Sequence, residues 1–277
     1  MTGRDEIQKQ PWRGQDMGAQ RTKVALFVFA LLSASLSGCF GDSLEILPER
    51  KGIPGGLTLA CLQDDAYTSM VIEIDYEAGY KPMTSSTDML VDRLESVCDK
   101  PGGISIDFTE VDFGHSGDWS ANDVREEAWD NKDNSPREGS ILTWQIIFPS
   151  GTYDDSSVLG VAVDASTVAL FGDSIQTANG PFNRPSVEDV ENSVIVHEVG
   201  HLLGLVNLVY QSPVDHEDED NEGHSNNDDS VMYWAIESAD LANFIFGTLP
   251  NDFDDDDLAD LAGMADGSIK VTDQLWS

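Results

Sequence analysis

Basic side chains are scarce in this chain. Its 277 residues include 15 Lys and Arg against 51 Asp and Glu, and the formal net charge is −36. Proteins bind nucleic acids through patches of Lys and Arg, so this balance excludes a nucleic-acid partner. Apolar residues are not scarce. They make up 40% of the chain, which is enough for the core of one domain of about 200 residues with additional segments.

Long apolar runs are also missing. The apolar stretch Val24–Leu36 spans thirteen residues, which is short for a transmembrane helix and suits the hydrophobic segment of a signal peptide. A third of the chain's basic side chains precede this stretch: Arg4, Lys9, Arg13, Arg21 and Lys23. The stretch ends in Leu36-Ser37-Gly38-Cys39.

This order of a basic segment, an apolar segment, small residues and a Cys resembles the lipobox of secreted lipoproteins. The resemblance implies cleavage before Cys39 and a lipid on its thiol, and it predicts an exported protein held at a membrane or cell surface. Residues 1–38 would then be the signal peptide, 39–56 a tether and 57–277 the folded domain. The alternative is an uncleaved N-terminal anchor with an incidental Cys39.

Cysteine is also scarce, with three in the chain. Once Cys39 is assigned to the lipobox, Cys61 and Cys98 remain. In an exported protein two remaining cysteines most simply form a disulfide, and the alternative is two free buried thiols.

The pattern of apolar residues predicts an α/β fold. Leu57–Cys61 and Ser69–Tyr76 are expected to be extended, a helix is expected over 85–97 with Ser86 or Thr87 as its cap, and Ile104, Ile106 and Phe108 alternate as a second strand. A strand, a helix and a strand in this order favour a crossover within a mixed sheet.

Further elements are expected along the rest of the chain. A helix is expected over 120–130, a buried strand over 141–148, and a hairpin of 159–164 with 167–171. After a loop over 172–185, a helix capped by Ser186 is expected to end near Gly204. Two more helices are expected over 238–246 and 257–264.

Two of the five histidines lie four residues apart, in the segment Ile195-Val-His-Glu-Val-Gly-His-Leu-Leu-Gly-Leu-Val-Asn207. On a helix, His197 and His201 share one face and can bind the same ion. Glu198 beside them can act as general base toward a water on that ion. The surrounding residues are apolar, so the imidazoles would be buried and would need partners. The alternative is a core helix with two hydrogen-bonded histidines.

A catalytic zinc ion takes three protein ligands and keeps one open position. The spacing of His197, His201 and Gly204 resembles that of the metzincins, a class of zinc proteases whose third ligand lies three residues after the Gly. In this chain that position is Asn207, and an amide oxygen is a weak zinc ligand.

The segment Ser230-Val-Met-Tyr-Trp234 resembles the Met-containing turn that lies beneath the metal in metzincins. His224 precedes Met232 by eight residues, which is similar to the spacing in matrix-metalloproteinase-like members. The resemblance therefore implies that His224 is the third ligand, delivered by an insertion of seventeen residues after Asn207. His216, in the same insertion, is the second candidate, and Asn207 or water is the third.

The insertion and the residues after it are strongly acidic. They include Asp215, Glu217, Asp218, Glu219, Asp220, Glu222, Asp228 and Asp229. Carboxylates at this density could bind Ca²⁺ and order the loop, although no EF-hand spacing is present. The alternative is a solvated charged surface.

The resemblance implies a zincin-like α/β fold with a mixed twisted sheet, an active-site helix, a Met-turn and a small, mostly helical C-terminal subdomain. It implies zinc-dependent hydrolysis of peptide bonds, with His197, His201 and His224 as metal ligands and Glu198 as general base. The substrate would be a peptide or protein aligned along one arm of the hairpin at 159–171. We expect the protein to be a monomer.

The second hypothesis belongs to a different class. It is a surface lipoprotein with a structural zinc or calcium site and no turnover. Glu198 favours the hydrolase, because a purely structural site has no use for a carboxylate beside its first ligand.

Overall fold

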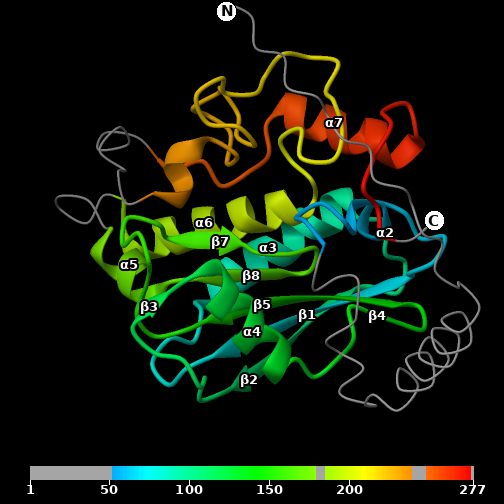
Figure 1. Ribbon diagram of the computed structural model, residues 1–277. Coiled ribbons are helices and arrows are strands. Elements are labelled where there is room, and N and C mark those ends of the chain that lie inside the picture. The colour runs from blue at the N-terminus through cyan, green and yellow to red at the C-terminus, as the bar shows by residue number, and fades with distance from the viewer. Residues whose placement is uncertain (1–51, 179–184, 239–247, 276–277) are drawn as a thin grey trace, which may run out of the picture. The chain divides into compact units, whose positions relative to one another are not determined.

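The computed structural model describes residues 52–178, 185–238 and 248–275 (Figure 1). These residues belong to one compact unit that extends to the end of the chain. The predicted signal peptide, Cys39 and most of the predicted tether lie outside the described residues. No helix of the described part is both long enough and apolar enough to span a membrane.

A mixed sheet forms the centre of the fold. Its strand order is β2-β1-β5-β8-β7, comprising β2 (Ile104–Glu110), β1 (Ser69–Tyr76), β5 (Ile141–Phe148), β8 (Thr167–Leu170) and β7 (Gly160–Ala162). The first four strands are parallel, and β7 runs antiparallel to β8, so that these two strands form the predicted hairpin. A short β4 (Arg137–Glu138) pairs with β5, and β3 (Asp118–Trp119) pairs with β6 (Thr152–Tyr153) in a separate ribbon. The predicted α/β class is confirmed.

Helices cover both faces of this sheet. Met70, Ile72 and Ile74 of β1 point to the face that carries α3 (Thr84–Val97) and α6 (Val187–Leu202), and they belong to the larger apolar core. On the other face Ile147 of β5 packs in a smaller core with α4 (Ala121–Asn131). In Figure 1, α3 and α6 lie above the strands, and α4 crosses in front of them. Alternate residues of a strand point to opposite faces, and β5, buried nearly throughout, supplies both cores.

Helices α4 and α6 both begin with a capping box. The box at Ser186 is the predicted cap of α6, and for α4 the sequence left the cap open between Ser120 and Asn122. Ser120 accepts a hydrogen bond from the backbone N–H of Asp123, and Ser186 does the same for Asp189. In each case the Asp carboxylate accepts the N–H of the capping Ser in return. These reciprocal bonds satisfy N–H groups that have no partner inside the helix.

Helix α3 begins differently from the prediction. Its N-cap is Met83, without a side-chain cap. The hydroxyl of Ser86 is buried and donates to Glu191 of α6 at 2.8 Å, and Glu191 also accepts the N–H of Met83 at 2.7 Å. The carboxylate of a neighbouring helix therefore replaces the local cap, which the sequence of α3 alone could not indicate.

Two short helices also differ from the prediction. The segment Leu57–Cys61, expected to be extended, lies mostly within the helix α2 (Thr58–Leu62), and α5 (Gly172–Thr177) lies within the expected loop. Both are held by contacts with distant segments. Leu59 donates its N–H to Gln274, and Asp173 accepts hydrogen bonds from Tyr80 and Gly151. Local sequence pattern does not carry such contacts, and they decide the conformation of short segments.

The chain beyond α6 crosses over the side of that helix that faces away from the sheet (Figure 1). It contains the 3₁₀ helix η3 (Trp234–Glu237) and α7 (Asp255–Asp266). Helix α7 covers the predicted helix at 257–264. The predicted helix at 238–246 falls almost entirely on residues outside the described part.

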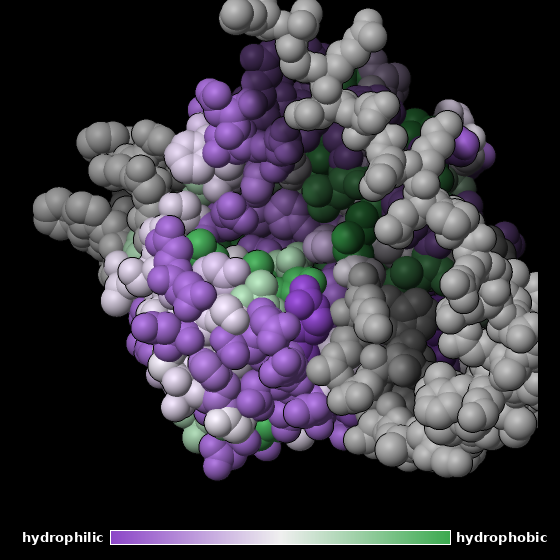
Figure 2. Space-filling view, in the orientation of Figure 1, coloured by the Kyte–Doolittle hydropathy of each residue, from purple (hydrophilic) through white to green (hydrophobic). Residues whose placement is uncertain are grey.

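The acidic composition is visible on the surface. The face shown in Figure 2 is covered mainly by hydrophilic residues, and hydrophobic residues gather in a band across its middle. Carboxylates spread over a surface in this way keep the protein hydrated and raise its negative potential.

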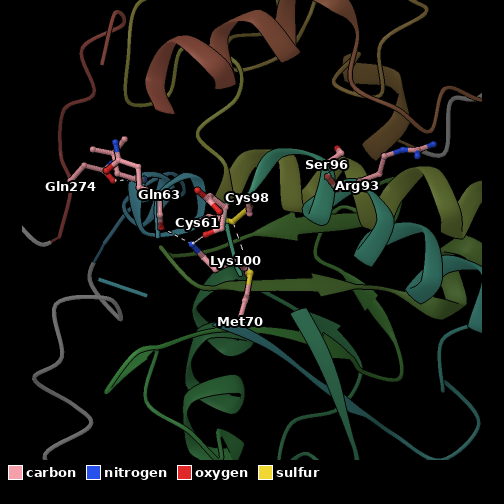
Figure 3. Close-up of a disulfide and its surroundings, with 10 residues drawn as sticks. Cys61, Gln63, Met70, Arg93, Ser96, Cys98, Lys100 and Gln274 are labelled. Carbon is pink, nitrogen blue, oxygen red and sulfur yellow. Dashed lines mark hydrogen bonds between the residues drawn. A yellow bond between two sulfur atoms is a disulfide. The ribbon is translucent and has the colours of Figure 1, made fainter. Parts of the chain in front are cut away.

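Cys61 and Cys98 form a disulfide, as the sequence predicts (Figure 3). The bridge joins the end of α2 to the end of α3, across a separation of 37 residues, and both sulfurs lie in the larger core. Lys100 beside it is buried and donates to the backbone carbonyl of Gln63 at 2.6 Å. The bridge and this hydrogen bond together anchor α2.

We expect the Cys61→Ser/Cys98→Ser variant to lose about 4 kcal/mol of unfolding free energy, because an unfolded chain without the cross-link of this loop has more conformational entropy. Urea unfolding measures this loss. Cys39→Ser is the control, since it removes a cysteine and leaves the bridge intact. An unchanged unfolding midpoint in the double variant would contradict the structural role given to the bridge.

Candidate metal centre

Helix α6 presents two imidazoles on one face. The ring centroids of His197 and His201 are 4.8 Å apart, and both side chains are buried. Helix α6 is buried along its whole length from Val190 onward because the sheet lies on one side and the C-terminal segments on the other. The two rings therefore project from a rigid element.

The third imidazole comes from the segment that follows the insertion. The ring centroid of His224 lies 5.3 Å from that of His197 and 5.0 Å from that of His201. Potential ligand atoms of these three residues and of Glu237 lie within 4.8 Å of one another. The structure thus brings together the three histidines that the sequence analysis selected.

A clasp between Asn207 and Glu217 explains how His224 returns to the helix. The Asn207 side chain donates to one oxygen of Glu217 at 2.9 Å, and the other oxygen accepts the N–H of Gly223 at 2.9 Å. The N–H of Val206 donates to the carbonyl of Gly223 at 3.0 Å. Both ends of the insertion are thereby held together, and His224 follows directly.

Each of the three imidazoles is oriented by a backbone carbonyl. Nδ1 of His197 lies 2.7 Å from the carbonyl oxygen of Val231, Nδ1 of His201 lies 3.0 Å from that of Leu205, and Nδ1 of His224 lies 3.2 Å from that of Glu222. A carbonyl oxygen only accepts, so each Nδ1 carries the proton. Nε2 of each ring is left as the unprotonated nitrogen, which is the form that binds a metal ion.

The buried nitrogens at the centre of the cluster test whether a metal ion fits there. Nε2 of His197 and of His224 are both buried without a hydrogen-bond partner. Unpartnered buried nitrogens are costly, and a cation removes that cost. Three imidazole nitrogens with a nearby carboxylate are a donor set that suits zinc. These residues therefore fit the ion that the sequence predicts.

Glu198 lies against the edge strand β7. Its side chain is fully buried, and neither carboxylate oxygen has a hydrogen bond. A methyl group at Gly160 of β7 would lie 2.6 Å from the Cγ atom of Glu198. The glycine is therefore required for the carboxylate to occupy this place, and the sequence analysis did not identify it.

Glu237 is a site residue that the sequence analysis missed. Its Oε2 atom lies 3.5 Å from Nε2 of His224 and 3.8 Å from Nε2 of His197. Its backbone carbonyl accepts the N–H of Leu159, next to β7, and this pairing carries the Glu237 side chain to the histidines. No motif marks the residue, because its position depends on the pairing of two distant segments.

Burial controls the ionisation of the site. It lowers the pKa of His201 to about 3, and neighbouring His197 and His224 add to this, so the ring is neutral near pH 7. Burial raises the pKa of Glu198 well above its ordinary value, and the charge of Glu237 adds to this. Burial by itself would raise the pKa of Glu237. Its interactions with His197 and His224 outweigh burial, and the pKa is lowered. A carboxyl with a raised pKa is suited to act as a base near neutral pH.

Met232 lies directly beneath the histidines. Its sulfur packs against the backbone of Gly200, within the helix turn that joins His197 to His201, and leaves no room for a side chain there. The Met is completely buried. It therefore supports the ligand helix by packing.

The other candidate ligands lie elsewhere. His216 is buried against Asp260, with Nε2 2.9 Å from Oδ2 of that residue, and it is not part of the three-histidine cluster. Asn207 is engaged in the clasp and also accepts the N–H of Ser212. His115, which was not a candidate ligand, belongs to no cluster of ligand atoms in the described residues and contacts Trp119.

The carboxylates of the acidic loop, between Asp215 and Asp229, belong to none of the groups of clustered ligand atoms in the described part of the chain. Instead, Glu217 and Asp218 accept hydrogen bonds from backbone N–H groups of the loop itself, at Gly223, Asp220 and Asn221. Hydrogen bonds order this loop, and the calcium site remains a prediction.

The arrangement of the backbone is similar to that of archaemetzincins. The archaemetzincin of Methanopyrus kandleri is 13% identical, with a TM-score of 0.48 over 70% of this chain and 94% of that one. The archaemetzincin of Archaeoglobus fulgidus is 14% identical, with a TM-score of 0.37 over 69% and 99%. No family model matches this chain, and no curated protein matches its sequence.

We expect His224→Ala and His201→Ala each to reduce the zinc bound per chain by one ion after dialysis, because each change removes an imidazole from the same cluster. Metal analysis of the dialysed protein measures the loss. His115→Ala is the matched control, since this histidine lies outside the cluster. If His224→Ala retained as much zinc as the His115→Ala protein, the assignment of the third ligand would be wrong.

Proposed function

We propose that this protein is a zinc-dependent endopeptidase. The observation that carries the proposal is the pairing of three Nε2 atoms, directed to one point, with a buried carboxylate one residue along the helix from the first of them. A structural metal site would have all four of its ligands in the three histidines and Glu237. It would need no further carboxylate at the position of Glu198. The motif resemblance described above supports the same activity.

His197, His201 and His224 would hold the ion. Zinc bound there would supply a Lewis acid that polarises the scissile carbonyl and acidifies water. Glu198 would accept the proton of the attacking water and pass it to the leaving amine, a transfer for which its raised pKa is favourable. Gly160 of β7 leaves room for the Glu198 side chain, which is fully buried there.

Strand β7 would align the substrate. It is the last strand in the order of the sheet and contacts α6, which carries the ligands. An extended peptide can add to such an edge through main-chain hydrogen bonds, with its scissile bond close to the histidines. The sequence left open which arm of the hairpin forms this edge. The strand order favours 160–162 over 167–170.

A second candidate function is a closed structural site. Glu237 supports it, because three histidines and one carboxylate make four protein donors, as in structural zinc sites. In the hydrolase, Glu237 would have to withdraw from the ion when substrate and water approach. Its side chain is 34% exposed, which leaves it free to turn outward.

Glu198→Gln tests the hydrolase. We expect the variant to keep its zinc and to lose at least about a hundredfold in turnover of a casein-like substrate, because the amide cannot accept the proton. The matched control is Glu188→Gln, an exposed position in the first turn of the same helix. Peptide-library cleavage with and without a chelator measures the activity.

Two results would reject the endopeptidase. One is retained cleavage in the Glu198→Gln protein. The other is absence of cleavage in the zinc-loaded protein together with weaker zinc binding in Glu237→Gln, which is the behaviour of a closed four-donor site.

We also propose that the protein is exported and held at a membrane through a lipid on Cys39. The support lies in the order of segments before Cys39 and in the disulfide, since disulfides persist in oxidising compartments. A peptide or protein substrate outside the cell and a monomeric enzyme are parts of the same proposal.

Mass spectrometry of the mature N-terminus tests the anchor. We expect the mature chain to begin at a lipid-modified Cys39, and we expect Cys39→Ser to release the protein from the membrane fraction. Ser43→Ala is the control, since it changes the segment just after the predicted cleavage point and leaves Cys39 and the disulfide intact. An intact N-terminus that still begins at Met1, or a Cys39→Ser protein that stays with the membrane, would contradict cleavage and lipidation.

A further inference from the structure

The strongest unexplained cluster outside the metal centre surrounds His216. This residue belongs to the insertion, is 2% exposed and packs against α7. Its Nε2 contacts Asp260 of α7, whereas its Nδ1 has no hydrogen-bond partner. The nearest carboxylate to Nδ1 is that of Asp257, whose Oδ1 lies 3.9 Å away and is also buried without a partner. Two unpartnered polar atoms thus face each other in the interior.

Serine hydroxyls fix the orientation of both buried carboxylates. Ser230 donates to Oδ2 of Asp257 at 2.6 Å, and Ser212 donates to Oδ1 of Asp260 at 2.9 Å. In each Asp the remaining oxygen is left to face His216. The carboxylates are therefore held toward the imidazole by groups on the insertion and the Met-turn.

Two further carboxylates stand at the same end of α7. Potential ligand atoms of His216, Asp254 and Asp256 lie within 4.8 Å of one another. Asp254 is the N-cap of α7 and already accepts the N–H groups of Asp256 and Asp257. Asp256 is half-buried. Four aspartates therefore surround one imidazole.

The charge of this cluster is not balanced by protein cations. Within the described part of the chain, the ion-pair partner of Asp257 and of Asp260 is His216, and no Lys or Arg pairs with the four aspartates. Buried negative charge without a compensating cation is strongly unfavourable.

We propose that His216, Asp254, Asp256 and Asp257 form a second divalent-cation site, separate from the three-histidine centre. One imidazole nitrogen with several carboxylate oxygens selects a first-row transition ion such as Zn²⁺ or Mn²⁺ over Ca²⁺, which prefers oxygen donors alone. The 3.9 Å between Nδ1 and Oδ1 is compatible with two ligands of one ion at bond lengths of about 2.1 Å each.

The position of the site defines its role. Helix α7 contributes the carboxylates, and His216 lies in the insertion that ends at His224. Ser230, which orients Asp257, also accepts the N–H of Met232. An ion at His216 would therefore clamp α7 to the segment that carries the third histidine and the Met-turn, and its removal would loosen that segment.

The experiment uses the full chain with His201→Ala, which removes the first site, and Zn²⁺ or Mn²⁺ alone as the probe. We expect this protein to bind one ion per chain by metal analysis after dialysis. Adding His216→Gln should abolish the binding, and adding Asp256→Asn should weaken it by at least about tenfold, because a ligand is lost. Asp255→Asn is the matched control, since it lies in the same helix turn and is exposed.

The Asp256→Asn protein keeps the test decisive even where His216→Gln fails to fold, because Asp256 is half-buried and lies outside the apolar core. We expect its metal-free thermal midpoint to equal that of Asp255→Asn. Two outcomes overturn the site: no ion bound to the His201→Ala protein, or equal affinity in the Asp256→Asn and Asp255→Asn proteins. Peptide hydrolysis plays no part in these measurements, so failure of the proposed activity and failure of this site are seen separately.

Discussion

Three backbone carbonyls orient the imidazoles on which the candidate site depends. They belong to Val231, Leu205 and Glu222, which lie in different parts of the chain after α6. By accepting the Nδ1 protons they leave each Nε2 free to bind a metal ion. Helix α6 sets the spacing of the His197 and His201 rings. The tautomer of each ring is set by a backbone carbonyl in a later segment of the chain that folds back over the helix. The centre is therefore complete only when residues 205–231 are in place.

The insertion is the part of the structure that makes this return possible. Glu217 joins Asn207 to Gly223, and Asp218 holds the N–H groups of the loop tip. Some of the acidic residues thus have structural partners instead of serving only as solvated charge. On the other side of the insertion, His216 and the aspartates of α7 form the cluster for which we propose a second ion. The same loop connects the two centres physically.

Glu198 and Glu237 are two carboxylates beside the three-histidine cluster, and their surroundings give them different properties. Glu198 is buried between α6 and Gly160, where its pKa is raised and its carboxylate can act as a base. Glu237 is partly exposed, and its Oε2 atom lies 3.5 Å and 3.8 Å from the Nε2 atoms of His224 and His197, which lower its pKa. If Glu237 remains at the ion, the site is closed and structural. If it turns outward, the site has the open position that hydrolysis requires.

Local signals in the sequence were sufficient for α6, its Ser186 capping box, the His197 and His201 pair and the alternation of the strands, because these depend on neighbouring residues along the chain. The cap of α3, the short helices α2 and α5, and the position of Glu237 depend on contacts across the fold, which a linear pattern does not contain. The three-histidine site stands between these cases. Its residue types and spacing were readable and favoured His224 over His216. The place of His224 beside α6 depends on the clasp at Glu217, and the place of His216 depends on Asp260 of α7. Hydrogen bonds between segments distant in sequence set both positions.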